Sequence, residues 1–200
     1  MSLPANIKGL VFDCDGTLAD TMPLHWRAWQ VIAAKYKLDF PEDRFYSLGG
    51  VPSRDIVKML AKEQGVTLDY IRAAHEKENT YVPLMMQVKP IKVVVEIAQE
   101  NFGKVPMAVA SGGTQQIINQ VLEHLKIRQL FAAVVTNEMV VNQKPAPDIF
   151  LEAARLIGVP PQFCRGYEDT DLGLQAIRSA GMDAVDVRLL RRQSLTAIGR

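Results

Sequence analysis

The chain has 200 residues, of which 48% are hydrophobic and 22% are charged, and its formal net charge is +1. A chain of this length buries roughly 70% of its unfolded surface, so it needs no disulfide or metal to fold, and its composition argues against disorder. The balance of 23 Lys and Arg against 22 Asp and Glu argues against sequence-independent binding to nucleic acid, which requires a cationic excess.

Signals for secretion and membrane insertion are missing from the sequence. The first residues, Met1–Asn6, contain no basic segment followed by an apolar stretch, and no run approaches the roughly 18 apolar residues of a membrane span. Cys14 and Cys164 lack the spacing of metal ligands, so we expect two buried, reduced thiols. These features predict a cytoplasmic protein without a membrane partner.

The first predicted element is a buried strand at Leu10–Phe12, and a long interval without a convincing strand follows it. One helical face in this interval carries four apolar or aromatic residues, Trp26, Trp29, Ala33 and Tyr36. The stretches 56–64 and 68–86 also have helical periodicity, and Pro90 discourages a continuous helix beyond them. We therefore predict a helical cap domain at residues 21–88, inserted into a core formed by residues 1–20 and 89–200.

After the helical interval, short apolar runs alternate with helical segments. The remaining strands are expected at Met107–Ala110, Val134–Thr136, Phe163–Gly166 and Ala184–Val187. Apolar residues recur at helical spacing over Ile117–Leu125, and Pro147 and Gly158 bracket a helix over Ile149–Ile157. This alternation predicts an α/β fold with a Rossmann-like parallel sheet covered on both faces.

Residues suited to phosphate and metal chemistry follow the carboxyl ends of these strands, where ligands bind in open α/β sheets. Each has an ordinary explanation when taken alone, such as a turn, a helix cap or a linker. Their joint placement at one sheet edge favours a functional site, because two carboxylates two positions apart on extended chain point the same way and a helix N-terminus attracts phosphate. The set is Asp13, Asp15, Ser111, Gly112, Lys144, Glu168 and Asp169.

The convergence of four carboxylates in this set predicts a cation. Two like charges about 4 Å apart repel by roughly 4 kcal/mol at an effective dielectric constant near 20. Lys144 alone does not offset several such pairs, whereas Mg²⁺ binds a few carboxylates together with the phosphate oxygens of a substrate. The residues therefore indicate magnesium plus phosphate.

At these residues the chain resembles the haloacid dehalogenase-like (HAD) superfamily of phosphotransferases. The motifs Asp13–Thr17, Ser111, Lys144 and Glu168–Asp169 occur in the family's order and span most of the chain. The resemblance is closest to the β-phosphoglucomutase-like subgroup and, within it, to bacterial fructose-1-phosphate phosphatases. It implies an HAD-like core with an inserted helical cap.

The resemblance also implies roles for the residues. Asp13 resembles a nucleophile that forms an aspartyl-phosphate, and Asp15 resembles the general acid and base. Ser111 and Lys144 resemble phosphate clamps. The implied magnesium ligands are Asp13, the carbonyl group of Asp15, Glu168 and Asp169. The implied substrate-binding residues are Thr17, His25, Gly50, Arg54, Lys77 and Gly112.

Ordinary roles stay open for three cap residues in this set. His25 has the alternative of a surface or core histidine, and Lys77 that of an exposed helix lysine. For Arg54, Pro52 is an extra residue relative to the mutase pattern. It shifts the loop, so the match of Arg54 to a substrate-binding residue of the family stays open.

The resemblance implies a magnesium-dependent phosphatase that acts on a small phosphorylated sugar such as fructose 1-phosphate. The alternatives are a β-phosphoglucomutase, which shares every core residue, and a non-catalytic phosphate-binding relative. We expect a monomer or a weak homodimer.

Overall fold

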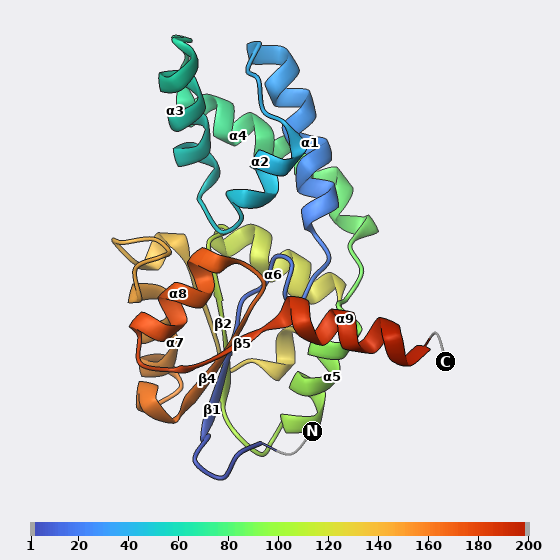
Figure 1. Ribbon diagram of the computed structural model, residues 1–200, viewed down its shortest axis with the longest axis vertical. Helices are drawn as coiled ribbons and strands as arrows, with labels where there is room; N and C mark the ends of the chain where they lie inside the picture. The colour runs from blue at the N-terminus through green and yellow to red at the C-terminus, as the bar shows by residue number, and fades with distance from the viewer. Residues whose placement is uncertain (1–2, 199–200) are drawn as a thin grey trace.

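The computed structural model describes the backbone of residues 3–198 and the side chains of residues 3–194. Its centre is a five-stranded parallel sheet with the strand order β3-β2-β1-β4-β5, which confirms the predicted α/β fold (Figure 1). The strands are β1 (Gly9–Phe12), β2 (Met107–Ser111), β3 (Ala133–Thr136), β4 (Cys164–Glu168) and β5 (Asp183–Asp186).

Helices cover both faces of the sheet because alternate residues of the buried strands face opposite ways. Leu10 and Phe12 of β1 belong to the apolar cluster that includes residues of α5, α6 and α9, whereas Val11 packs in the cluster of α7 and α8. Figure 1 shows the two groups on opposite sides of the sheet. These helices are α5 (Lys92–Asn101), α6 (Gln115–His124), α7 (Asp148–Leu156), α8 (Asp171–Ser179) and α9 (Val187–Ile198).

The interval between β1 and α5 is helical, as predicted, and lies above the sheet in Figure 1. It comprises α1 (Met22–Tyr36), α2 (Glu42–Ser47), α3 (Ser53–Gln64), α4 (Tyr70–Tyr81) and a 3₁₀ segment η1 (Val82–Gln87). The helix expected at 68–86 changes to 3₁₀ geometry after Tyr81, where Pro83 has no N–H and its ring crowds the preceding turn. Three-residue 3₁₀ turns lie at Arg128–Leu130, Asn137–Met139 and Pro161–Phe163.

This helical segment has an apolar cluster of its own but also contacts the sheet. Trp29, Phe40, Phe45 and Leu60 pack together inside it. Its sheet-proximal ends contribute to the large cluster beneath, through residues that include Tyr81. The division into a core of residues 1–20 and 89–200 and a cap of residues 21–88 stays a prediction.

Two further expectations concern single features. Cys14 and Cys164 are free and buried, as predicted. Across residues 3–198, every helix is too short or too polar to span a lipid bilayer.

Candidate active site

The loop after β1 places two aspartates at the carboxyl edge of the sheet. The Asp13 N–H donates to the carbonyl of Tyr167 at 3.0 Å, which continues the pairing of β1 with β4 and fixes the position of Asp13. The chain then turns sharply, with Gly16 at a φ of 86°, a left-handed conformation that glycine adopts without strain. Asp13 and Asp15 both line one pocket, as the sequence predicts.

Lys144 bridges two carboxylates behind this pocket. Its Nζ lies 2.7 Å from Asp13 Oδ1 and 2.7 Å from Glu168 Oε2, and only 2% of its side chain is exposed. Burial alone would lower the pKa of Lys144, but Asp13 and Glu168 outweigh it and raise the pKa, so the ammonium is charged. Lys144 is not among the residues that line the pocket, whereas both carboxylates that it contacts, Asp13 and Glu168, are.

Three carboxylates form a cluster that fits a hard cation. Asp13, Glu168 and Asp169 offer oxygen atoms that all lie within 4.8 Å of one another. Burial, followed by the charge of Glu168, raises the pKa of Asp13 well above its usual value, and the same two causes raise the pKa of Asp169 to about 7. These carboxylates are therefore poorly compensated by Lys144 alone, which is the electrostatic situation that a divalent cation relieves.

The oxygens of Glu168 are more occupied than those of the two aspartates. Oε1 accepts from the N–H groups of Asp169 and Thr170 and from the Thr170 hydroxyl, and Oε2 accepts from Lys144. Asp13 accepts from Lys144 through Oδ1 only, and Asp169 accepts from Thr17 through Oδ1 only. Among the described residues, Asp13 and Asp169 thus each keep an oxygen that receives no side-chain hydrogen bond.

Glycine and threonine shape the space beside Asp169. A Cβ atom at Gly16 would lie 2.2 Å from Asp169 Oδ2, so only glycine leaves this carboxylate in place. Thr17, expected to bind substrate, is fully buried and donates to Asp169 at 2.9 Å. It does not line the pocket, so the structure places it with the carboxylate cluster.

Asp15 is held by partners from the start of α1 and from the end of β2. Oδ1 accepts from the hydroxyl of Thr21 at 2.7 Å and lies 3.5 Å from Nε2 of His25, and Oδ2 accepts from Ser111 Oγ at 3.3 Å. Burial alone would raise the pKa of Asp15, but the hydrogen bond with His25 and the charge and hydrogen-bond effects of its neighbours lower it to about 2. The side chain of Asp15 is therefore anionic in this state and lies outside the three-carboxylate cluster.

The cap histidine has a defined proton position. Lys77 Nζ lies 2.8 Å from His25 Nδ1, and an ammonium group only donates, so Nδ1 accepts and Nε2 carries the proton toward Asp15. Burial and the charge of Lys77 lower the pKa of His25, which keeps the ring neutral. Tyr81 stacks on the ring at a centroid distance of 3.8 Å. Both His25 and Lys77 line the pocket, and Lys77 is buried rather than an exposed helix lysine.

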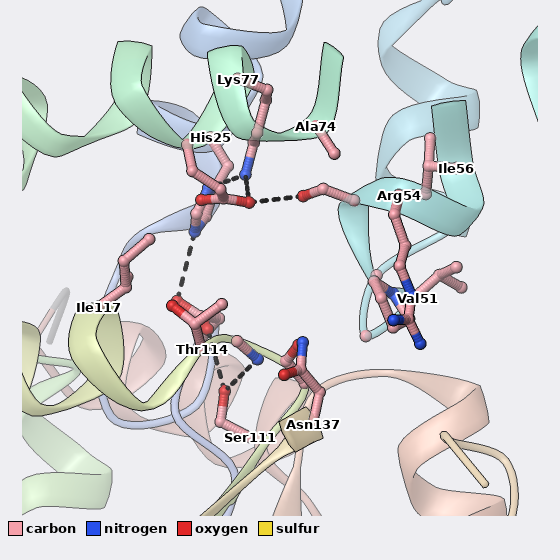
Figure 2. Close-up of a pocket in the computed structure, with 18 of the residues that line it drawn as sticks. His25, Val51, Arg54, Ile56, Ala74, Lys77, Ser111, Thr114, Ile117 and Asn137 are labelled. Carbon is pink, nitrogen blue, oxygen red and sulfur yellow. Dashed lines mark hydrogen bonds and ion pairs between the residues drawn. The ribbon is translucent and has the colours of Figure 1, made fainter. Parts of the chain in front are cut away.

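The chain at the ends of β2 and β3 forms the floor of the pocket, where Figure 2 shows Ser111 and Asn137 facing His25 and Lys77 across the cavity. Ser111 Oγ accepts from the Gly113 N–H at 3.1 Å, and the first N–H of α6 is taken by Glu138. The predicted phosphate seat is therefore partly occupied by protein groups.

The loop between α2 and α3 lies against this floor. A Cβ at Gly112 would lie 2.9 Å from the carbonyl oxygen of Gly50, so the two glycines bring the loops into contact. Arg54 also lines the pocket, but 62% of its side chain is exposed. The pocket has a volume of about 530 Å³, which suits a small ligand.

Sequence reasoning missed three residues that hold this arrangement together. Thr21 carries the hydrogen bond to Asp15, and Ser53 and Glu78 form a hydrogen-bonded pair next to Lys77. Thr21 directly precedes α1. A threonine there is typical of a helix N-cap residue, but that pattern does not indicate its contact with Asp15. Ser53 and Glu78 lie 25 positions apart, and no local pattern connects them.

Comparisons with known proteins agree with this geometry. The family model described as "Haloacid dehalogenase-like hydrolase" matches residues 10–187. Fructose-1-phosphate phosphatase YqaB of Escherichia coli (strain K12) is 40% identical over 183 residues, which cover 91% of this chain and 97% of that protein. Beta-phosphoglucomutase of Bacillus subtilis (strain 168) is 31% identical over 193 residues, 90% of this chain and 83% of that protein.

A solved structure has the same fold. The crystal structure of β-phosphoglucomutase from Clostridium difficile matches with a TM-score of 0.79 and 29% identity, and the match covers 90% of this chain and 84% of that one. The predicted resemblance and the HAD-like α/β fold are both confirmed.

Proposed function

The chain belongs to the haloacid dehalogenase-like hydrolase family, and from that premise we propose that it is a magnesium-dependent phosphatase of small sugar phosphates. The observation that carries the proposal is that one pocket holds two carboxylates with different surroundings, which raise the pKa of Asp13 and lower the pKa of Asp15. Asp13 is buried and fixed by Lys144, whereas Asp15 is held by Thr21 and Ser111 under the cap histidine. Transfer of a phosphoryl group through a covalent intermediate needs one carboxylate as nucleophile and a second to handle protons.

The carboxylate cluster fits Mg²⁺ as the cation. Asp13 and Asp169 each have a carboxylate oxygen without a side-chain hydrogen bond from the described residues, and Glu168 is the third carboxylate of the cluster. Gly16 has no side chain and so leaves room for the carboxylate of Asp169. Together with the carbonyl group of Asp15 these residues would hold the ion. When bound, Mg²⁺ neutralises the carboxylates and the phosphate oxygens, so that one anion can approach another.

The residues of the chain carry the proposed steps. An oxygen of Asp13 attacks phosphorus, the bond from phosphorus to the sugar oxygen breaks, and the sugar oxygen takes a proton from Asp15. A water molecule then gives a proton back to Asp15 and attacks the phosphorus, which releases phosphate and restores the Asp13 carboxylate. Lys144 keeps Asp13 oriented, and the Ser111 hydroxyl, which donates to Asp15 in this structure, would turn to donate to a phosphate oxygen of the bound substrate.

The acid role of Asp15 depends on the substrate. Without substrate, its pKa of about 2 keeps Asp15 deprotonated. The negative charge of a phosphate ester bound against Asp15 raises this pKa through like-charge repulsion, so the carboxyl takes up a proton with the substrate. His25 Nε2 points its proton at Asp15 and favours the carboxylate form, which is the form that takes a proton from water in the second step.

Fructose 1-phosphate is the proposed type of substrate, since the 40% identical relative is named for that activity. β-Phosphoglucomutase activity is the second candidate, supported by the relative of that name at 31% identity. A cytoplasmic location and a monomeric or weakly dimeric state stay predictions from the sequence.

One experiment tests both candidates. Phosphate release is measured with Mg²⁺ on a panel of sugar phosphates that includes fructose 1-phosphate, and in parallel glucose 6-phosphate formation is followed from β-glucose 1-phosphate with a bisphosphate primer. We expect release of phosphate that chelation of Mg²⁺ abolishes. Rapid isomerisation with negligible release would identify a mutase instead, and a folded protein silent in both assays would identify a non-catalytic relative.

A further inference from the structure

The cap side of the pocket carries a carboxylate that the proposed chemistry does not use. Glu78 of α4 lines the pocket next to Lys77, with 26% of its side chain exposed. Its hydrogen bonds converge on one oxygen, since Oε1 accepts from Ser53 Oγ at 2.7 Å and from Lys77 Nζ at 3.1 Å. The other oxygen, Oε2, receives no hydrogen bond from the residues that the structure describes, so it is available to a ligand in the pocket.

The available oxygen belongs to a charged group. Burial alone would raise the pKa of Glu78, but the charge of Lys77 and the hydrogen bonds from Ser53 and Lys77 lower it below its usual value. A carboxylate accepts hydrogen bonds and donates none. Oε2 therefore suits the hydroxyl group of a ligand and repels a phosphate or a carboxylate.

The cations on the cap side do not counter this preference. Among the described lysines and arginines that line the pocket there, Lys77 lies 3.1 Å from Glu78, and Arg54 lies 3.7 Å from Asp55 and is largely exposed. Each positive charge is thus next to a negative one. Figure 2 shows Lys77 on the opposite side of the cavity from Ser111 on the floor. The pocket accordingly favours an anion at the floor and a neutral polar group beneath the cap.

We propose that Glu78 is a specificity-determining residue that accepts a hydrogen bond from a substrate hydroxyl through Oε2. This contact selects a monophosphate with an uncharged, polyhydroxylated body over a ligand that carries a second anion at the cap end. The inference rests on the proposed function, because it takes the floor of the pocket as the seat of the reacting phosphate. It also disfavours the mutase, whose sugar bisphosphate intermediate carries a second phosphate.

The test compares two substrates that share one sugar, fructose 1-phosphate and fructose 1,6-bisphosphate. Values of kcat/KM for phosphate release are measured for the wild type, Glu78→Gln and Ser53→Ala, with Glu76→Gln as the matched control. Glu76 lies on the same helix, pairs with Lys35 and does not line the pocket. Circular dichroism and the thermal midpoint report folding of each variant.

We expect the wild type to prefer the monophosphate and Glu78→Gln to narrow that preference by at least about tenfold, because the variant loses the charge that repels a second phosphate and a hydrogen bond to a charged acceptor. Ser53→Ala should narrow the preference for the monophosphate less, since it removes one hydrogen bond to the Glu78 carboxylate and leaves its charge. Glu76→Gln should keep the wild-type ratio of the two kcat/KM values.

The outcomes separate the two claims. A wild type that releases no phosphate from any ester overturns the proposed function and this inference with it. A wild type that hydrolyses fructose 1-phosphate while folded Glu78→Gln keeps the wild-type ratio refutes the role of Glu78 and leaves the phosphatase intact. If Glu78→Gln does not fold, an unchanged ratio in Ser53→Ala refutes it.

Discussion

Replacement of Lys144 by Met should destabilise the protein strongly and in a way that depends on metal and pH. The side chain of Lys144 is 2% exposed, and its ammonium lies 2.7 Å from both Asp13 and Glu168. At an effective dielectric constant near 20, each contact at that distance has a gross Coulomb energy of about 6 kcal/mol. The cost of desolvating the lysine offsets much of this. Breaking a buried pair by removing one partner therefore leaves a net loss of about 3–5 kcal/mol.

The assay is urea unfolding of the wild type and Lys144→Met, each with a chelator and with Mg²⁺. We expect the full loss with the chelator and a smaller loss with Mg²⁺, because the cation compensates the two carboxylates that the variant leaves unpaired. Lys104→Met is the matched control, since Lys104 is exposed in the turn before β2. Its free energy of unfolding should stay within about 0.5 kcal/mol of the wild type.

The pH dependence gives a second check. Lys144 lowers the pKa of Asp13, so its removal raises that pKa further. A carboxyl with a raised pKa in the folded state favours folding below its unfolded pKa, and this contribution is lost as the pH rises through the folded pKa. The deficit of Lys144→Met should therefore shrink in acid. A deficit below about 1 kcal/mol with the chelator, or one that does not change with pH, would refute the electrostatic reasoning.

Three further predictions concern the metal and the acid–base pair. Gly16→Ala places a Cβ 2.2 Å from Asp169 Oδ2 at a φ of 86°, so calorimetry should find Mg²⁺ affinity lowered by about tenfold or more, and an unchanged affinity would contradict the assigned cluster. Burial and the charge of Glu168 raise the pKa of Asp169 to about 7, so protons compete with Mg²⁺ for this carboxylate below that pH. The apparent affinity for Mg²⁺ should therefore fall by up to about tenfold for each pH unit below 7. An affinity for Mg²⁺ that stays constant between about pH 5 and 7 would contradict this prediction. His25→Ala removes the main group that lowers the pKa of Asp15. The acidic limb of the pH profile of kcat/KM should therefore move to higher pH, and kcat should fall by about 10- to 100-fold. An acidic limb at the wild-type pH would show that His25 does not lower the pKa of Asp15.

The parts of the fold that depend on local patterns were predictable from the sequence. Strand β1 is a short apolar run, and Asp13 and Asp15 follow it directly, so their place at the sheet edge follows from the parallel topology. The helical interval was predictable from the spacing of Trp26 and Trp29, although the effect of Pro83 on the end of α4 was missed.

The contacts that decide the chemistry were not predictable in the same way. The sequence placed Asp13 and Lys144 at one sheet edge, but nothing in it indicates that Lys144 donates directly to Asp13, 131 positions away, or that Thr21 donates to Asp15. The sequence predicted Glu168 as a carboxylate of a metal site but did not reveal that Lys144 and the residues starting α8 occupy its oxygens. These are side-chain contacts between elements, which depend on packing rather than on periodicity.

The central claim is that Asp13 carries the phosphoryl group. The most direct measurement is rapid quenching of the enzyme during turnover of fructose 1-phosphate, reduction of any acyl phosphate with borohydride, and mass spectrometry of the tryptic peptide Gly9–Arg27. We predict homoserine at position 13 in the wild type and none in Asp13→Asn, which should also lose at least about a thousandfold in turnover. Turnover of Asp13→Asn near the wild-type rate, or modification at another carboxylate, would contradict the account.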